Sequence, residues 1–179
     1  MKKILIGLFA FLLSACSLIQ SNGPKEKVRE LLDKYKSQDN VIISQLDDII
    51  SDEYDGEYQE RYKKLMINQY KNLEYEITDE IIDGNTAVVT ADITVYNYGS
   101  AIETANDYLR EHEDEFYKDE EKKEIDNDKF LDYKFDLLEQ VDDRKTYTLE
   151  FTLTKEDKDW VVDDLSNEKI SKIHGIYYE

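Results

Sequence analysis

Apolar residues between positions 24 and 73 recur at intervals of three and four, which is the period of amphipathic helices. The pattern predicts three helices. The first begins at Pro24, whose missing N–H costs nothing there, and ends near Lys36. Asp39 can cap the second, and the third begins near Asp55. Their apolar stripes are Val28, Leu31, Leu32 and Tyr35; Ile42, Ile43, Leu46, Ile49 and Ile50; and Tyr58, Tyr62, Leu65, Met66, Gln69, Tyr70 and Leu73.

From Leu73 onward apolar and polar residues alternate, which is the pattern of a strand with one buried face. Asp83-Gly84-Asn85 favours a tight hairpin turn, because these residue types tolerate a positive φ. The returning strand is predicted from Thr86 to Tyr98. Its core face carries Ala87, Val89, Ala91, Ile93 and Val95, and its other face carries Val88, Thr90, Asp92, Thr94, Tyr96 and Tyr98.

The helical period returns between Gly99 and Arg144 and predicts a helical hairpin inserted between strands. A charged stretch from Lys118 to Asp128 is expected to form its solvated connection. The buried stripes are predicted to be Ile102, Ala105, Leu109, His112 and Phe116 in the first helix, and Phe130, Tyr133, Leu137, Leu138 and Val141 in the second.

Alternation then resumes and predicts two closing strands, the second starting at Trp160 after a turn. Ser166 can cap a short last helix, and Gly175 suits its end. The whole pattern predicts a single α+β domain over residues 24–179, with N-terminal helices packed on a curved antiparallel sheet and the helical hairpin of residues 99–144 inserted. The inward residues of the first closing strand are predicted to be Tyr147, Leu149, Phe151 and Leu153.

The N-terminus has the pattern of an export signal. Lys2 and Lys3 form a positive start, Ile4 to Leu13 an apolar stretch, and Ser14 and Ala15 the small residues before a signal-peptidase cut. The apolar stretch is about half the roughly 20 residues that a membrane-spanning helix needs.

The tetrapeptide Leu13-Ser14-Ala15-Cys16 resembles the lipobox of bacterial lipoproteins. The resemblance implies that residues 1–15 are a signal peptide, that Cys16 is lipidated, and that residues 16–23 are a tether. Two or more acyl chains anchor a protein stably, so we expect it on the extracytoplasmic face of the cell membrane. The alternative is an ordinary secretory signal that leaves Cys16 as a free thiol. A composition rich in Lys, Asn, Ile, Tyr and Glu is typical of an AT-rich genome and suits a low-GC Gram-positive source.

The chain is strongly acidic, with 42 acidic residues, 23 basic residues and a net charge of −19. Lys2 and Lys3 lie in the signal, so its removal changes the net charge to −21. This argues against nucleic acid, whose phosphates require Lys and Arg, and against lying flat on an anionic leaflet. We expect a monomer with cationic, neutral or metal-bearing partners, although the charge alone would also keep a surface protein soluble. Because Cys16 is the sole cysteine, no disulfide can form within the chain.

Helices followed by antiparallel strands resemble the nuclear-transport-factor-2-like, or cystatin-like, α+β cone of many small bacterial lipoproteins. The best local match is the closing hairpin from Tyr147 to Leu165, in which Trp160 opens the last strand. The match lacks the Asp-Gly step that often precedes this tryptophan. The insertion of residues 99–144 is larger than a minimal cone needs, which indicates a cavity that is occluded or rebuilt. Because the fold serves isomerases, dehydratases, transport factors and binding modules, the resemblance implies no single function.

Three titratable residues are candidates for chemistry. His112 lies on an apolar stripe, where it is either a general base tuned by burial or a core or interface histidine. His174 suits a cation in the last turn of a helix. Asp92 is a conceivable base with Tyr96 as proton donor, as in cone-fold isomerases, but alternation places Asp92 on the polar face of its strand.

We expect neither a metal nor a cofactor. Calcium-loop alignments on Gly56 and Gly84 place wrong residue types in ligand positions, and the sequence has no Cys/His cluster and no phosphate loop. The fourteen tyrosines mark either an interface or the edge of an amphipathic core. Tyr96, Tyr98 and Trp160 are predicted to form a binding rim.

These observations favour a membrane-anchored binding or protein-interaction module that uses the cone cavity or its aromatic rim, with an envelope protein among its expected partners. One alternative is a cone-fold isomerase or dehydratase that uses Asp92, His112 and a tyrosine. Another is an acidic accessory protein of an envelope complex.

Overall fold

The computed structural model describes residues 23–119 and 124–178. The proposed signal and lipidation residues Leu13, Ser14, Ala15 and Cys16 lie outside this range. The elements are α1 (Pro24–Lys36), α2 (Asn40–Glu53), α3 (Glu57–Lys71), β1 (Glu74–Asp83), β2 (Thr86–Tyr96), α4 (Tyr98–Glu111), the 3₁₀ turn η1 (Glu113–Phe116), α5 (Asn127–Glu139), β3 (Arg144–Glu156), β4 (Asp159–Val162) and α6 (Asn167–Ile173).

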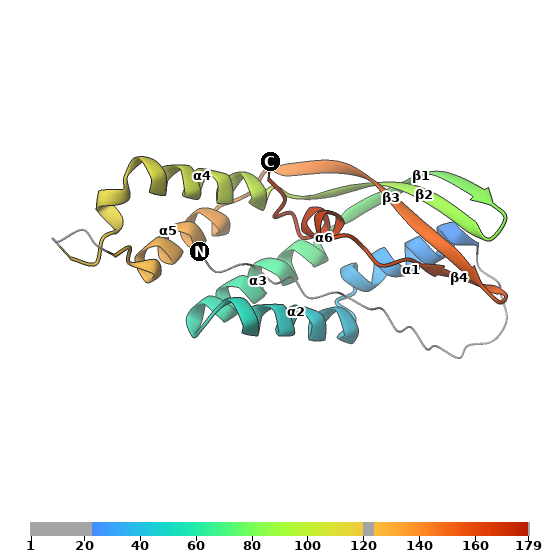
Figure 1. The fold of residues 1–179 in the computed structure, drawn as a ribbon, viewed down its shortest axis with the longest axis horizontal. Helices are drawn as coiled ribbons and strands as arrows, with labels where there is room; N and C mark the ends of the chain where they lie inside the picture. Colours follow the sequence, from blue (N-terminus) through green and yellow to red (C-terminus); the bar gives the residue numbers. More distant parts are fainter. Residues whose placement is uncertain (1–22, 120–123, 179) are drawn as a thin grey trace.

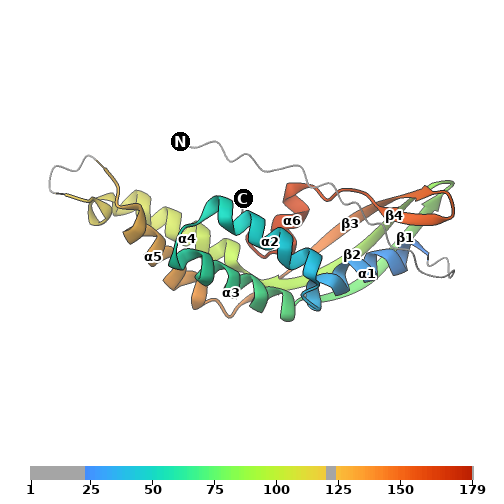
Figure 2. The same cartoon turned by 90° about the horizontal axis from the view of Figure 1, so that it is seen from below.

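The four strands form one antiparallel sheet in the order β1-β2-β3-β4. Helices α1, α2, α3 and α6 lie on one side of this curved sheet, and the hairpin of α4 and α5 extends past the end that is opposite the β1–β2 turn (Figure 1, Figure 2). The predicted fold class is therefore confirmed. We call the sheet side that faces away from these helices the outer face.

Local signals determine where several helices begin. The carboxylate of Asp39 accepts the Val41 N–H at 2.9 Å, and the hydroxyl of Ser166 accepts the Lys169 N–H at 3.3 Å, as predicted for both caps. Helix α1 has a cap that the sequence did not suggest, because the carboxylate of Glu80 on β1 accepts its Lys25 N–H at 3.0 Å. This anion also suits the positive end of the helix dipole.

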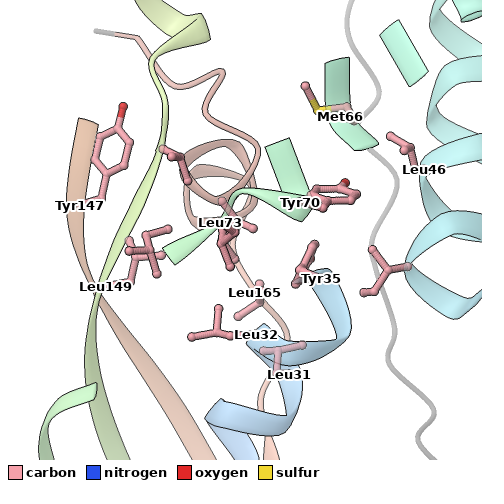
Figure 3. Close-up of a cluster of buried hydrophobic side chains, with 14 of the residues drawn as sticks. Leu31, Leu32, Tyr35, Leu46, Met66, Tyr70, Leu73, Tyr147, Leu149 and Leu165 are labelled. Atoms are coloured by element: carbon pink, nitrogen blue, oxygen red, sulfur yellow. The ribbon is translucent and has the colours of Figure 1, made fainter. Parts of the chain in front are cut away.

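The core lies between the sheet and the helices. All the residues predicted on the inward faces of β2 and β3 are buried, so the predicted phase of alternation is confirmed. Figure 3 shows Leu32 of α1, Leu73 before β1 and Leu149 of β3 in this core. Within the described part of the chain, no helix has the length and apolarity needed to cross a membrane.

Strand β2 is two residues shorter than predicted, and this moves Tyr98. The strand ends at Tyr96, whose N–H donates to the side-chain oxygen of Gln69 at 2.9 Å. The N–H of Asn97 then donates to Asp143 O at 3.1 Å, and α4 begins at Tyr98. Tyr98 is consequently a buried helical residue and does not share the strand face with Tyr96.

Helix α5 buries more than the predicted stripe. Leu138 is buried as expected, while Phe130 and Tyr133 are half-buried against the α4 side of the helical hairpin. Phe135, which is absent from that stripe, is fully buried and packs on Tyr58 of α3 with ring centroids 5.6 Å apart. Helix α5 therefore packs against both α4 and α3, whereas the sequence pattern indicated only the hairpin with α4.

Candidate binding surface

Rows of cross-strand neighbours build the outer face. β2 and β3 pair without interruption, and β1 joins them with one irregularity between Ile77 and Asp79. The outer-face residues are Glu74, Glu76, Asp79, Ile81 and Asp83 of β1, Thr86, Val88, Thr90, Asp92, Thr94 and Tyr96 of β2, Arg144, Thr146, Thr148, Glu150, Thr152, Thr154 and Glu156 of β3, and Asp159 and Val161 of β4.

Arg144 occupies the end of the outer face nearest the helical hairpin. Its guanidinium lies 5.4 Å from the ring centroid of Tyr96, and its Nη1 is 2.7 Å from the carboxylate of Glu74. It also donates to the backbone oxygen of Thr94 at 2.8 Å. These contacts balance the charge of Glu74 and partly cover Tyr96, so this end of the face carries little free charge.

The middle of the outer face carries carboxylates. Glu76 lies opposite Asp92 in the strand register, and the hydroxyl of Thr148 donates to Asp92 at 2.6 Å. Glu150 lies in the next row. Among the described residues, neither Glu76 nor Glu150 has an ion-pair partner. The middle of the face is therefore negatively charged and only partly compensated.

Apolar residues lie on the outer face between the middle carboxylates and the β1–β2 turn, and Asp83, Glu156 and Asp159 follow at the very end of the face. Ile81 is 63% exposed and lies opposite Val88, which in turn lies opposite Thr152. Val161 of β4 lies opposite Thr154. The aliphatic side chains and threonine methyl groups form a surface of short, β-branched residues next to the carboxylates.

The predicted rim of Tyr96, Tyr98 and Trp160 is not a common surface. Tyr96 lies half-buried on the outer face, whereas Tyr98 donates from its hydroxyl to Leu65 O at 3.4 Å inside the core. Trp160 points to the inner side of β4 and is 8% exposed. Tyr98 and Trp160 therefore contribute to the packing of the core and not to a binding rim.

Asp92 and His112 do not meet in a shared cavity. Asp92 lies in the middle of β2, and His112 caps the far end of α4, beyond the sheet (Figure 1). The imidazole of His112 is stacked on Tyr108 with centroids 4.2 Å apart, and it lies 3.6 Å from a carboxylate oxygen of Glu115. This partly exposed position differs from the buried stripe that was predicted. The geometry does not support an enzyme that uses both residues.

The interpretation of His174 as a cation at a helix end is wrong. The side chain is 6% exposed, and its Nε2 is 3.0 Å from the hydroxyl of Tyr70. Burial lowers the pKa of His174 to about 4, so the imidazole is neutral at pH 7. It contributes a polar contact to the core and no charge to the helix dipole.

A small depression lies among α1, α2, α3 and α6, with a cavity volume of only about 10 Å³. Its lining includes Tyr35, Leu46, Tyr70 and His174. Pockets for small ligands occupy roughly 300–1,000 Å³ and enclose most of the ligand. The depression therefore gives little support to binding in a cone cavity. In the described residues, no group of three or more His, Cys, Asp or Glu side chains is arranged to hold a metal ion.

Comparisons with protein-family models, curated proteins and solved structures find no match to this chain. Sequence reasoning placed Asp92 and Tyr96 on the outer face but did not single out Glu76, Glu150 or Ile81. Alternation identified the exposed side of β2 and β3, but the irregularity after Ile77 and the strand pairing decide which β1 residues join it.

Proposed function

We propose that this protein is an extracytoplasmic lipoprotein that is held by lipid on Cys16 and binds another envelope protein through the outer face. The observation that carries the proposal is this broad sheet surface, which no described helix covers and which combines apolar residues with unpaired carboxylates (Figure 1). Exposed apolar area beside polar groups is typical of surfaces that bind proteins.

The start of α1 supports a tethered arrangement. Helix α1 begins close to the β1–β2 turn, where Glu80 caps it (Figure 1). Residues 17–23 span at most about 25 Å when fully extended. A lipid on Cys16 would therefore hold the turn end of the sheet near the membrane. Because the strands run along the long axis of the molecule, the outer face would stand to the side and remain open to a neighbouring protein.

Replacing the lipidated residue tests the anchor. We expect Cys16→Ala to abolish palmitate labelling and to release the protein from the membrane fraction, because no other cysteine can accept the lipid. Ser17→Ala is the matched control and should leave both measurements unchanged. Undiminished labelling of Cys16→Ala would contradict the lipoprotein assignment.

The binding role is tested by site-specific photo-crosslinking in intact membranes. A photoreactive residue at Thr152, on the outer face, should form a discrete protein adduct. The same residue at Ser51, which is exposed on α2, should not. Equal crosslinking from both positions would argue against the outer face as the interface.

A further inference from the structure

We propose that the partner presents a β-strand surface on which Lys or Arg residues lie beside apolar residues, and that this surface packs face to face on the outer face. The inference rests on the proposed function and specifies the chemistry of its partner. Basic groups of the partner would lie over Glu76 and Glu150, and its apolar residues would cover Ile81 and Val88.

Charge requires a cationic partner. Glu76, Asp92 and Glu150 lie in adjacent rows, and Arg144 is engaged by Glu74 at the far end. An apolar or anionic surface placed over these rows would bury carboxylates without partners, which is strongly unfavourable. Lys or Arg side chains would pair with them and also exploit the negative field of the whole chain.

The shape of the outer face favours a strand surface. Alternate residues on a strand lie about 7 Å apart, and packed sheets are about 10 Å apart. β3 presents Thr146, Thr148, Thr152 and Thr154 to solvent, and these short side chains let another strand surface approach the sheet closely. A partner strand with alternating outward residues can match these rows of carboxylates and methyl groups with the same spacing.

A second copy of this chain is a poor occupant. Packing two outer faces about a two-fold axis would bring the carboxylate rows of Glu76, Asp92 and Glu150 near those of the other copy. Each chain also carries a net charge of −19 before any processing. The repulsion between the two copies would oppose their association, so the surface selects a partner of opposite charge.

The experiment measures binding of synthetic cyclised β-hairpin peptides to the purified full-length protein in detergent micelles. One peptide alternates Lys and Val on one face, and its counterpart carries Glu in place of Lys. The lysine peptide should bind, and its affinity should fall as the salt concentration rises. The glutamate peptide should not bind. Equal binding of both peptides, or absence of lysine-peptide binding, would overturn the proposal.

Variants locate the binding. The double variant Glu76→Gln/Glu150→Gln should weaken lysine-peptide binding about threefold to tenfold, as expected for two exposed ion pairs. Ile81→Thr should weaken it about threefold or more through lost apolar contact. Asp48→Asn/Asp52→Asn removes the same charge from the exposed side of α2 and should have no effect. An equal effect of both double variants would contradict docking on the outer face.

The urea midpoint of each variant checks that it remains folded, since these side chains are exposed. The crosslinking experiment separates the two levels of the proposal. A Thr152 adduct that persists unchanged in Glu76→Gln/Glu150→Gln and at high salt would refute the cationic partner and retain the binding role. Absence of any adduct from the outer face would refute both.

Discussion

Two glycines allow the C-terminal segment to lie against the start of α4. The N–H of Gly99 donates to Gly175 O at 2.8 Å, and a Cβ on Gly99 would lie 2.0 Å from the backbone oxygen of Tyr177. Gly175 has a φ of +73° and faces Tyr96 O, with which a Cβ would also clash. At both positions the backbones are too close for any side chain.

We expect Gly99→Ala to lower the free energy of unfolding by about 2 kcal/mol or more, because the new methyl group must displace backbone atoms. Alanine favours helices, so this loss would come from the clash and not from helix propensity. Urea denaturation measures the change. Ser100→Ala, at the exposed neighbouring position, should change the stability by less than about 0.5 kcal/mol. A Gly99→Ala protein of normal stability would show that the C-terminal segment is loosely held.

His174 makes stability depend on pH. Its pKa is about 4 in the folded protein and about 6.5 when unfolded, so the unfolded chain binds more protons between these values. The contribution of the neutral His174 imidazole to the free energy of unfolding is therefore present above pH 6.5 and is lost as the pH falls toward 4. The groups that contact the imidazole are the rings of Tyr70 and Tyr35, and neither carries a charge in this range.

We expect the wild type to lose about 2 kcal/mol more stability between pH 7 and pH 5 than His174→Gln does. Glutamine removes the titrating group and can still form a hydrogen bond with Tyr70. Urea unfolding at the two pH values measures the difference, and the carboxylates that titrate in both proteins cancel in the comparison. The same pH slope in both proteins would show that His174 is not kept neutral by the fold.

At the scale of elements, α5 is held to the body of the molecule by contacts with α3 and with the end of α2. The ring of Phe135 packs on Tyr58 and Tyr54 with centroid distances of 5.6 Å in each case. Arg61 of α3 lies 5.1 Å above the same ring and bonds Asp136 and Glu139 at 2.8 Å. The ion pairs are partly exposed and contribute little, so the buried ring dominates this attachment.

We expect Phe135→Ala to cost about 3–5 kcal/mol and to raise hydrogen exchange first in α4 and α5, because a fully buried ring is lost where these helices attach. Hydrogen exchange followed by mass spectrometry would report each element separately. Phe130→Ala, at a half-buried site of the same helix, should cost less. Increased exchange spread evenly over the sheet would contradict this local attachment.

At the scale of the whole molecule, α1 begins near one end of an elongated domain, and the α4–α5 hairpin lies at the other end (Figure 1). The net charge opposes contact with an anionic membrane. If the long axis of the domain stood perpendicular to the membrane, the start of α1 would lie near the lipid and most of the acidic surface would lie away from it. This orientation would keep the outer face exposed along its length and the helical hairpin far from the lipid.

Energy transfer to an acceptor dye in the membrane would test this orientation. Single cysteines introduced at Asn85, in the β1–β2 turn, and at Glu113, beyond α4, would each carry a donor dye on the lipidated full-length protein. We expect markedly stronger transfer from Asn85. Equal transfer from both positions would show that the domain lies flat or tumbles freely on its tether.

The sequence by itself determined the type and order of nearly all the elements. The phase of alternation in β2 and β3, the caps at Asp39 and Ser166, and the Gly84 turn all follow from local periodicity and backbone preference, which need no distant partner.

Only the tertiary structure decided which side chains became surface and which became core. Tyr98 and Trp160 are buried because a helix starts earlier than the pattern indicated and because β4 pairs with its tryptophan turned inward. Phe135 and His174 are buried by helices distant in sequence. The outer face depends on the register of four strands. Some of its contacts join residues far apart in sequence, such as Arg144 and Glu74, which are 70 positions apart. Local patterns specify elements, but a surface made by several elements exists only once their packing fixes the register.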